Sequence, residues 1–243
     1  MTRRLARLAA LAVLAAGCAS AAPPERGLLL RRLVASTVQL RAEREGGVRR
    51  SASGVVVASD PARARSWVLT TRHFVEPEAA QQVYLTVPGR RERWRGRVAA
   101  VSREEDLAVV EVEGLALPAV ALQDTARLGG EIWLVSFPWG RRLTVVSGVV
   151  SQIAADEGAV MLEGAARMVD APASYGASGG GVFDAATGGL IGIVEGYRTA
   201  RVTLQTAPER TVDIPVPGET TVLATPGIRR FLRSAGVEVA GVE

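Results

Sequence analysis

Short runs of β-branched and apolar residues, separated by Gly, Pro and Asp, follow one another along most of this chain. Runs of this length with turn residues between them predict an all-β barrel or sandwich. In the first half the expected strands are 34–40, 54–58, 67–70, 82–87, 94–100 and 107–112. In the second half they are 131–136, 143–153, 159–162, 181–183, 190–195 and 202–205. Strands do not alternate with long helices in this pattern, which argues against an α/β sheet.

Two segments have a helical pattern instead. Residues 225–235 have a Pro near their start and Gly236 after their end, the signals of a complete helix, and residues 26–33 predict a shorter one. Leu117-Pro118 divides the strand-rich region into halves of similar size. We therefore expect a first β-barrel over 34–118, a second over 119–225 and a helix with a tail over 226–243, with a cleft between the barrels.

The first residues have the order of an export signal. Arg3, Arg4 and Arg7 precede an apolar run over 8–16, which Gly17-Cys18 follows. We expect 1–17 to be a signal peptide and 18–33 to be a tether with a short N-terminal segment. The run is too short to span a bilayer as a mature helix, and no later segment is apolar enough to do so.

The residues before Cys18 resemble a bacterial lipobox, with Ala15 where Leu is usual. Lipidation of Cys18 would hold an exported protein to the membrane on the periplasmic side of a bacterial envelope. The alternative is an ordinary secretory signal in which Cys18 is only a small residue. Cys18 is the sole Cys, so intramolecular disulfides are excluded and the fold depends on its core.

Composition excludes several kinds of site. The chain of 243 residues is 48% hydrophobic and has one His and no Lys, so Ser–Lys catalysis and a multi-histidine metal site are both excluded. We expect neither a metal nor an organic cofactor.

The net charge is +4, and the basic stretch 89–97 with Trp94 could suggest a nucleic acid or an anionic lipid. A hairpin with solvated arginines accounts for it better, so no nucleic-acid partner is expected.

The single His73 lies upstream of Ser178, which has glycines close on both sides. A serine hydroxyl is a weak nucleophile until an imidazole takes its proton, and the glycines let backbone N–H groups turn inward as an oxyanion hole requires. Asp106, at the start of an apolar strand, is the candidate for orienting the imidazole. Glu104 and Glu105 precede that apolar run and are expected to face solvent.

Chain order separates two serine hydrolase folds. Residues 176–180 also fit the G-x-S-x-G pattern of α/β-hydrolases, but those enzymes place the His after the Ser, and no His follows Ser178. The order His73, Asp106, Ser178 is that of chymotrypsin-like proteases.

These three motifs resemble the trypsin-like (chymotrypsin-fold) serine protease family, most closely its bacterial HtrA/Deg-type branch, here without the PDZ domain typical of that branch. The resemblance runs from about residue 34 to 232. It implies an all-β fold of two six-stranded antiparallel β-barrels with a C-terminal helix. It also implies that Ser178 is the nucleophile, His73 the general base and then acid, and Asp106 the orienting carboxylate. The N–H groups of Gly176 and Ser178 would form the oxyanion hole.

By the same resemblance, a specificity pocket would have Pro172 at its base and one wall made by Val194, Glu195, Gly196 and Tyr197. Without an acid at the base, a small or medium apolar side chain is the expected guest. Glu195 would reverse that preference if it pointed inward.

Two residues depart from the family pattern. Ala177 stands where Asn or Asp is usual, which removes activation by N-terminal trimming, and Gly181 stands in place of Pro and adds flexibility to the loop.

The expected function is a serine endopeptidase that cleaves envelope proteins. The alternatives are a catalytically silent peptide-binding module of the same fold and an esterase with the same triad. Trimers are common among the relatives, but the sequence does not define an oligomeric state.

Overall fold

The computed structural model describes residues 24–44, 47, 49–76, 81–154, 160–205 and 210–239. The expected signal peptide and Cys18 lie outside these residues. Residues 33–243 form one unit and residues 1–32 another. In the described part, no helix is long and apolar enough to span a membrane.

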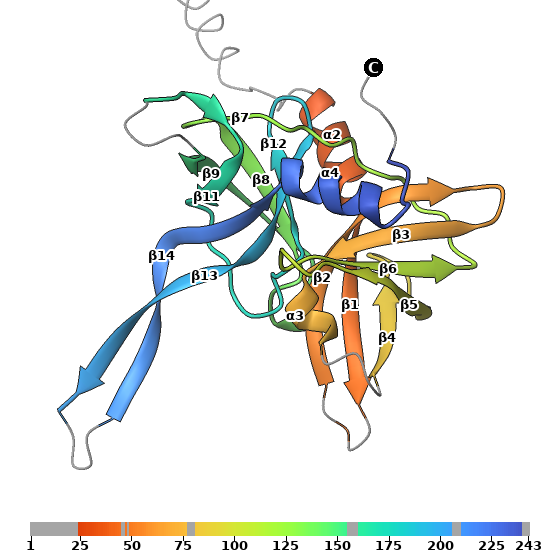
Figure 1. The fold of residues 1–243 in the computed structure, drawn as a ribbon, viewed down its shortest axis with the longest axis horizontal. Helices are drawn as coiled ribbons and strands as arrows, with labels where there is room; N and C mark the ends of the chain where they lie inside the picture. The colour runs from red at the N-terminus through yellow and green to blue at the C-terminus, as the bar shows by residue number, and fades with distance from the viewer. Residues whose placement is uncertain are drawn as a thin grey trace, which may run out of the picture. The chain divides into compact units, whose positions relative to one another are not determined.

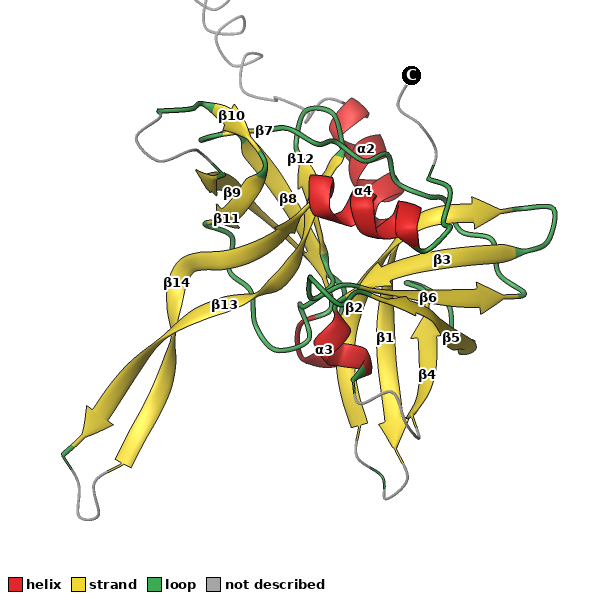
Figure 2. Ribbon diagram, viewed as in Figure 1, coloured by secondary structure: helices red, strands yellow, loops and turns green. Residues whose placement is uncertain are grey.

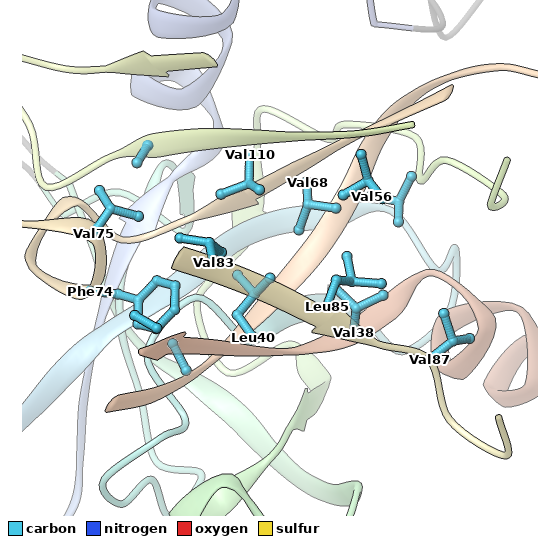
Figure 3. Close-up of a cluster of buried hydrophobic side chains, with 14 of the residues drawn as sticks. Val38, Leu40, Val56, Val68, Phe74, Val75, Val83, Leu85, Val87 and Val110 are labelled. Carbon is cyan, nitrogen blue, oxygen red and sulfur yellow. The ribbon is translucent and has the colours of Figure 1, made fainter. Parts of the chain in front are cut away.

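The first half of the chain closes into a six-stranded antiparallel barrel in the order β1-β2-β3-β6-β5-β4. Its strands are β1 (Thr37–Arg44), β2 (Arg49–Asp60), β3 (Arg65–Thr70), β4 (Gln81–Thr86), β5 (Trp94–Val101) and β6 (Ala108–Glu113). Side chains from several strands, including Leu40, Val68 and Leu85, gather in one buried cluster (Figure 3). Phe74 and Val75, from the one-turn helix α3 (Arg72–Val75), belong to the same cluster.

The second half closes into another six-stranded antiparallel barrel, in the order β11-β14-β13-β12-β8-β9. Its strands are β8 (Glu131–Ser136), β9 (Thr144–Ile153), β11 (Ala166–Val169), β12 (Gly181–Asp184), β13 (Leu190–Leu204) and β14 (Arg210–Ala224). The short strands β7 (Ala126–Arg127) and β10 (Glu163–Gly164) pair with each other beside it. The predicted two-barrel fold is therefore confirmed.

Helices are few and short in the described residues (Figure 2). The helix α2 (Pro24–Ala35) is longer than expected and displaces the start of the predicted strand 34–40 to Thr37. A single 3-10 turn, η1 (Pro138–Gly140), follows β8. The predicted C-terminal helix is α4 (Thr225–Ser234), which buries Ile228, Phe231 and Leu232.

Two predictions for the second half were wrong. Residues 160–162 form no strand, because Val160, Met161 and Leu162 are all exposed and pack in no core; β10 and β11 follow them instead. The expected strands 190–195 and 202–205 are parts of one strand, β13, and β14 was not expected at all.

Beyond the barrel, β13 and β14 continue as a two-stranded ribbon, seen at the lower left of Figure 1. Residues 199–204 pair with 210–215, from Thr199 opposite Pro215 to Leu204 opposite Arg210. We call these paired residues the hairpin arm. Pro215 lacks an N–H group, and such residues predict loops but are tolerated in edge strands.

Candidate active site

His73 and Asp106 lie against each other in the first barrel. One Asp106 carboxylate oxygen, Oδ2, is 2.6 Å from His73 Nδ1, and the other, Oδ1, accepts a 2.8 Å hydrogen bond from the His73 backbone N–H. An ionised carboxylate only accepts hydrogen bonds, so we assign the ring proton to Nδ1. Nε2 of the neutral ring then carries the lone pair that can take a proton.

The local structure explains why this histidine is held and still accessible. Its helical neighbours Phe74 and Val75 are buried and fix α3 to the barrel core, whereas the His73 side chain is 47% exposed. The Arg72 backbone N–H also donates to the Asp106 carbonyl, at 3.1 Å. The imidazole is therefore fixed on its Nδ1 side and partly open to solvent.

The carboxylates next to Asp106 take different positions. Glu105 accepts a 2.9 Å hydrogen bond from Arg230 of α4, and Glu104 is exposed. The side chain of Asp106 is only 17% exposed. Of the three carboxylates in this loop, Asp106 is the one that contacts the imidazole. Glu105, expected to face solvent, is partly buried.

The loop that carries Ser178 follows a path that needs glycine. Gly176 and Gly179 have φ angles of 86° and 81°, a region that other residues rarely adopt. A Cβ atom at Gly176 would lie 2.9 Å from the Phe137 carbonyl oxygen. A Cβ atom at Gly179 would collide with the Ser53 carbonyl oxygen. The two glycines thus allow the serine loop to approach both barrels closely.

Ser53 of β2 joins this loop to the first barrel. Its backbone N–H donates to the Ser178 carbonyl at 2.9 Å, and its hydroxyl donates to the Gly176 carbonyl at 2.8 Å. The same hydroxyl accepts a 2.8 Å hydrogen bond from the Phe137 N–H, and the Ser53 carbonyl accepts one from the Thr70 hydroxyl at the same distance. Since Thr70 lies three residues before His73, Ser53 connects the segments that carry the base and the nucleophile.

Ser53 could not be predicted as a site residue from the sequence. The only signal was a hydroxyl at the edge of a predicted apolar strand, and many such residues only satisfy a nearby backbone group. Ser53 is completely buried. Buried hydroxyls need hydrogen-bond partners, and here these partners come from the other barrel.

The two backbone N–H groups that are expected to form the oxyanion hole donate to no described residue. Within the described residues, no acceptor is found for the backbone N–H of Gly176 or of Ser178, whereas the N–H between them, on Ala177, donates to the Ser174 carbonyl at 2.9 Å. The Ala177 side chain is buried in the core of the second barrel. The arrangement can offer two donors to a developing oxyanion.

The Ser178 hydroxyl itself makes no hydrogen bond to any described residue, and His73 Nε2 lies 3.5 Å from the Thr71 hydroxyl. Bonds between a catalytic serine and its base are often long until substrate binds. The structure thus brings His73 and Asp106 into direct contact and links Ser178 to them through Ser53 and Thr70.

The predicted pocket residues occupy different environments. Val194 is buried in the core of the second barrel, and its backbone bonds the serine loop through Gly179 and Gly180, both at 2.8 Å. Glu195 lines a cavity that also contains Glu105, Arg167 and Arg230. Gly196 and Tyr197 continue β13 and are partly buried, and Pro172 is exposed. The base of the specificity pocket remains a prediction.

Two aromatic side chains flank the serine loop. Trp139 is 64% exposed and Tyr175 is 48% exposed, with ring centroids 5.9 Å apart. The backbone N–H of Trp139 donates to the Tyr175 carbonyl, and Trp139 has a φ angle of 57°. A bulky residue in this region of backbone space is uncommon and signals a constrained turn.

Together these features define a two-barrel protein with an imidazole–carboxylate pair and a glycine-bounded serine where the barrels meet. The family model of the trypsin-like peptidase domain matches residues 52–193. The chain therefore belongs to the trypsin-like peptidase family, and the predicted family is confirmed.

Solved structures agree on the fold. A serine endoprotease from Yersinia pestis is 19% identical, with a TM-score of 0.66, over 88% of this chain and 67% of that one. The HtrA-type protease AlgW, determined with a tripeptide, is 20% identical, with a TM-score of 0.66, over 86% of this chain and 62% of that one. This chain thus spans about two thirds of their length. The comparison with curated proteins found no match.

Proposed function

We propose that this peptidase is a serine endopeptidase that cleaves polypeptides through an acyl-enzyme on Ser178. The observation that carries the proposal is the His73–Asp106 pair, whose two hydrogen bonds leave Nε2 as the one ring atom able to accept a proton. The serine loop supplies the other parts of the site, since the backbone N–H groups of Gly176 and Ser178 donate to none of the residues that the structure describes.

The reaction follows from these positions. Ser178 Oγ attacks the carbonyl carbon of the scissile bond while His73 Nε2 takes the hydroxyl proton, and Asp106 stabilises the imidazolium that results. The oxygen of the tetrahedral intermediate accepts hydrogen bonds from the amides of Gly176 and Ser178. His73 then protonates the leaving amine as the C–N bond breaks. Water, deprotonated by His73, hydrolyses the ester and restores the Ser178 hydroxyl.

Turnover of an unfolded protein tests this proposal. Ser178→Ala should abolish cleavage of a reduced, alkylated polypeptide, because it removes the hydroxyl that forms the ester. Ser174→Ala, in the same loop, is the matched control and should retain activity, because Ser174 contributes its carbonyl to the Ala177 N–H rather than its side chain. Cleavage by Ser178→Ala at the wild-type rate would overturn the assignment.

A peptide-binding module without catalysis is the second candidate. It is favoured by Gly181 and Ala177 at positions where the family has Pro and Asn or Asp, and by the lack of a direct bond between Ser178 and His73 in the described contacts. Such a module would bind the unfolded polypeptide and never cleave it. An esterase with the same triad would hydrolyse small esters and leave polypeptides intact.

We also propose that the protein is exported and anchored by lipid at Cys18, facing envelope proteins in the periplasm. Only the order of residues in 1–18 supports this. Metabolic labelling with a palmitate analogue should mark the wild-type protein and be lost in Cys18→Ser. Equal labelling of both proteins would exclude the anchor.

A further inference from the structure

The hairpin arm has one apolar face and one polar face. Directly opposed residues of an antiparallel pair lie on the same side of the ribbon, and the register of the arm continues without a bulge from Thr199 to Leu204. One face has a polar character, with Arg201 Nε 3.1 Å from Asp213 Oδ1. The other face carries the apolar residues Ala200, Val202, Leu204, Val212 and Ile214, with Arg210 opposite Leu204 at its far end.

This apolar face is open to solvent. The four larger side chains on it, Val202, Leu204, Val212 and Ile214, are between 37% and 47% exposed. Long exposed strands with apolar residues invite pairing with another chain, and proteins normally protect such edges. The arm therefore has the properties of a surface that binds a polypeptide.

One edge of β13 runs from the serine loop to the arm. The same edge of β13 pairs with β12 up to Ile193, and at Val194 it bonds the backbone of Gly179 and Gly180. From Glu195 to Leu204, β13 pairs only with β14 in the part of the chain that the structure describes. A free strand edge thus begins next to the serine loop and continues into the arm, past irregularities in the β13–β14 pairing between Val194 and Gly196 and between Tyr197 and Thr199.

The position of Pro215 in the ladder indicates which backbone groups of β13 face its free edge. It has no N–H and so cannot exchange the two hydrogen bonds of a bonded pair with Thr199. Bonded and non-bonded pairs alternate along an antiparallel ladder. The backbone groups of Thr199, Arg201 and Thr203 consequently face away from β14 toward the free edge of β13.

We propose that the free edge of the hairpin arm, residues 199–204 of β13, binds an extended segment of the polypeptide substrate as an added strand. This inference rests on the proposed endopeptidase function. The irregular pairing between Tyr197 and Thr199 separates this edge from the part of β13 beside the serine loop, so the added strand would hold substrate residues that lie some way along the chain from the scissile bond. It could pair with up to about six substrate residues, because paired strands advance residue for residue.

The arm also favours a particular substrate chemistry. Alternate side chains of an added strand would lie beside Val202 and Leu204 on the apolar face, so segments with apolar residues at every second position should bind best. Arg201 and Arg198 are paired with Asp213 and Glu219, which leaves these two cations little charge to offer an anionic partner. An unfolded apolar polypeptide fits this surface.

Two proline variants separate the two edges of the arm. Thr203→Pro removes an N–H that faces the free edge of β13, while Thr211→Pro removes its counterpart from the opposite edge, in the same cross-strand pair. Loss of one backbone hydrogen bond, with the steric block of the proline ring, should lower kcat/KM for a long unfolded polypeptide about tenfold in Thr203→Pro only. A short chromogenic ester should be hydrolysed equally by the wild type and both variants.

Binding measurements keep this test independent of catalysis. In a Ser178→Ala background, Thr203→Pro should raise the Kd for a fluorescent unfolded polypeptide about tenfold, and Thr211→Pro should leave it unchanged. If the wild type hydrolyses neither substrate while these Kd values still differ, the endopeptidase proposal fails and the arm proposal stands. Equal Kd values for the two proline variants would overturn the arm proposal.

A second pair of variants covers the case in which proline disrupts folding. Val202→Asn places an amide on the apolar face, and Thr203→Asn places the same group on the polar face. The first should weaken polypeptide binding and the second should not. If sedimentation instead shows that Thr203→Pro dissociates an oligomer while polypeptide binding is unchanged, the edge joins copies of this chain and the proposal is wrong.

Discussion

The two halves of the candidate site are held in different ways. His73 and Asp106 are fixed by side-chain hydrogen bonds of 2.6 Å and 2.8 Å and by the buried neighbours of His73. Ser178 is held by its backbone, through glycines and through a carbonyl bonded to Ser53. The base is thus built into one barrel, whereas the nucleophile depends on how closely the two barrels approach.

Substitutions at the His73–Asp106 pair and substitutions at the serine loop should therefore have different consequences. Changes at the base should leave the fold intact and remove the chemistry, because the imidazole loses its orientation. Changes at the serine loop should affect both activity and stability, because the same hydrogen bonds position Ser178 and join the barrels.

Among the substitutions that test this difference between base and serine loop, Asp106→Asn should have the largest effect. An Asn amide can donate to Nδ1, which shifts the ring proton to Nε2 and removes the acceptor for the serine proton. We expect kcat to fall by about 10⁴-fold with little change in Tm. Glu105→Gln, one residue away and bonded to Arg230, is the control and should retain activity. Comparable losses in both variants would mean that the Asp106 carboxylate has no special role.

Gly176→Ala should have a smaller effect on kcat and an additional effect on stability. The added Cβ would lie 2.9 Å from Gly140 N and from Phe137 O, in a backbone region that Ala rarely adopts. The loop must shift, and displacement of one oxyanion donor should lower kcat by about 10²- to 10³-fold. Unchanged steady-state kinetics would contradict the assignment of this amide to the oxyanion hole.

Ser53→Ala should give the smallest loss of activity, together with a clear loss of stability. It leaves the buried Gly176 carbonyl and Phe137 N–H without their partner, which should cost about 2–4 kcal/mol in the free energy of unfolding. Because this bond positions the serine loop, kcat/KM should also fall. Denaturant titration and peptidase assays at a temperature where the variant is folded measure the two effects.

Ser66→Ala is the matched control for that variant. The Ser66 hydroxyl is equally buried, donates to the Leu115 carbonyl at 2.8 Å and accepts from the Leu117 N–H at 3.0 Å. Those partners do not belong to the serine loop. The control should lose comparable stability and keep its kcat/KM, and a similar fall in kcat/KM in both variants would show that Ser53 does not position the nucleophile.

The fold and the candidate site could be predicted from the sequence because several residues together left few alternatives. A single His, an Asp at the start of an apolar strand and a glycine-bounded Ser left one chain order, and the strand pattern indicated the barrels. Family membership and the two-barrel fold are confirmed. The catalytic roles stay predictions, although His73 and Asp106 are in contact.

Features that depend on pairing between distant segments could not be predicted. Ser53 matters because of Gly176 and Phe137, which lie far along the chain and meet it only in the folded protein. The strand β14 contains Pro215, Pro217 and Gly218, which are typical of a loop, and it is a strand because β13 lies beside it. Periodicity describes how one segment buries a face, so an exposed hairpin gives little signal.

Reaction with a fluorophosphonate shows whether Ser178 is activated, because this reagent labels only a serine that a neighbouring base has activated. We expect a single adduct on Ser178 in the wild-type protein, found by mass spectrometry of its peptides. We expect no adduct in His73→Ala and very slow labelling in Asp106→Asn. Labelling of Ser178 at the same rate in all three proteins, or no labelling of the folded wild type, would contradict activation of Ser178 by the His73–Asp106 pair.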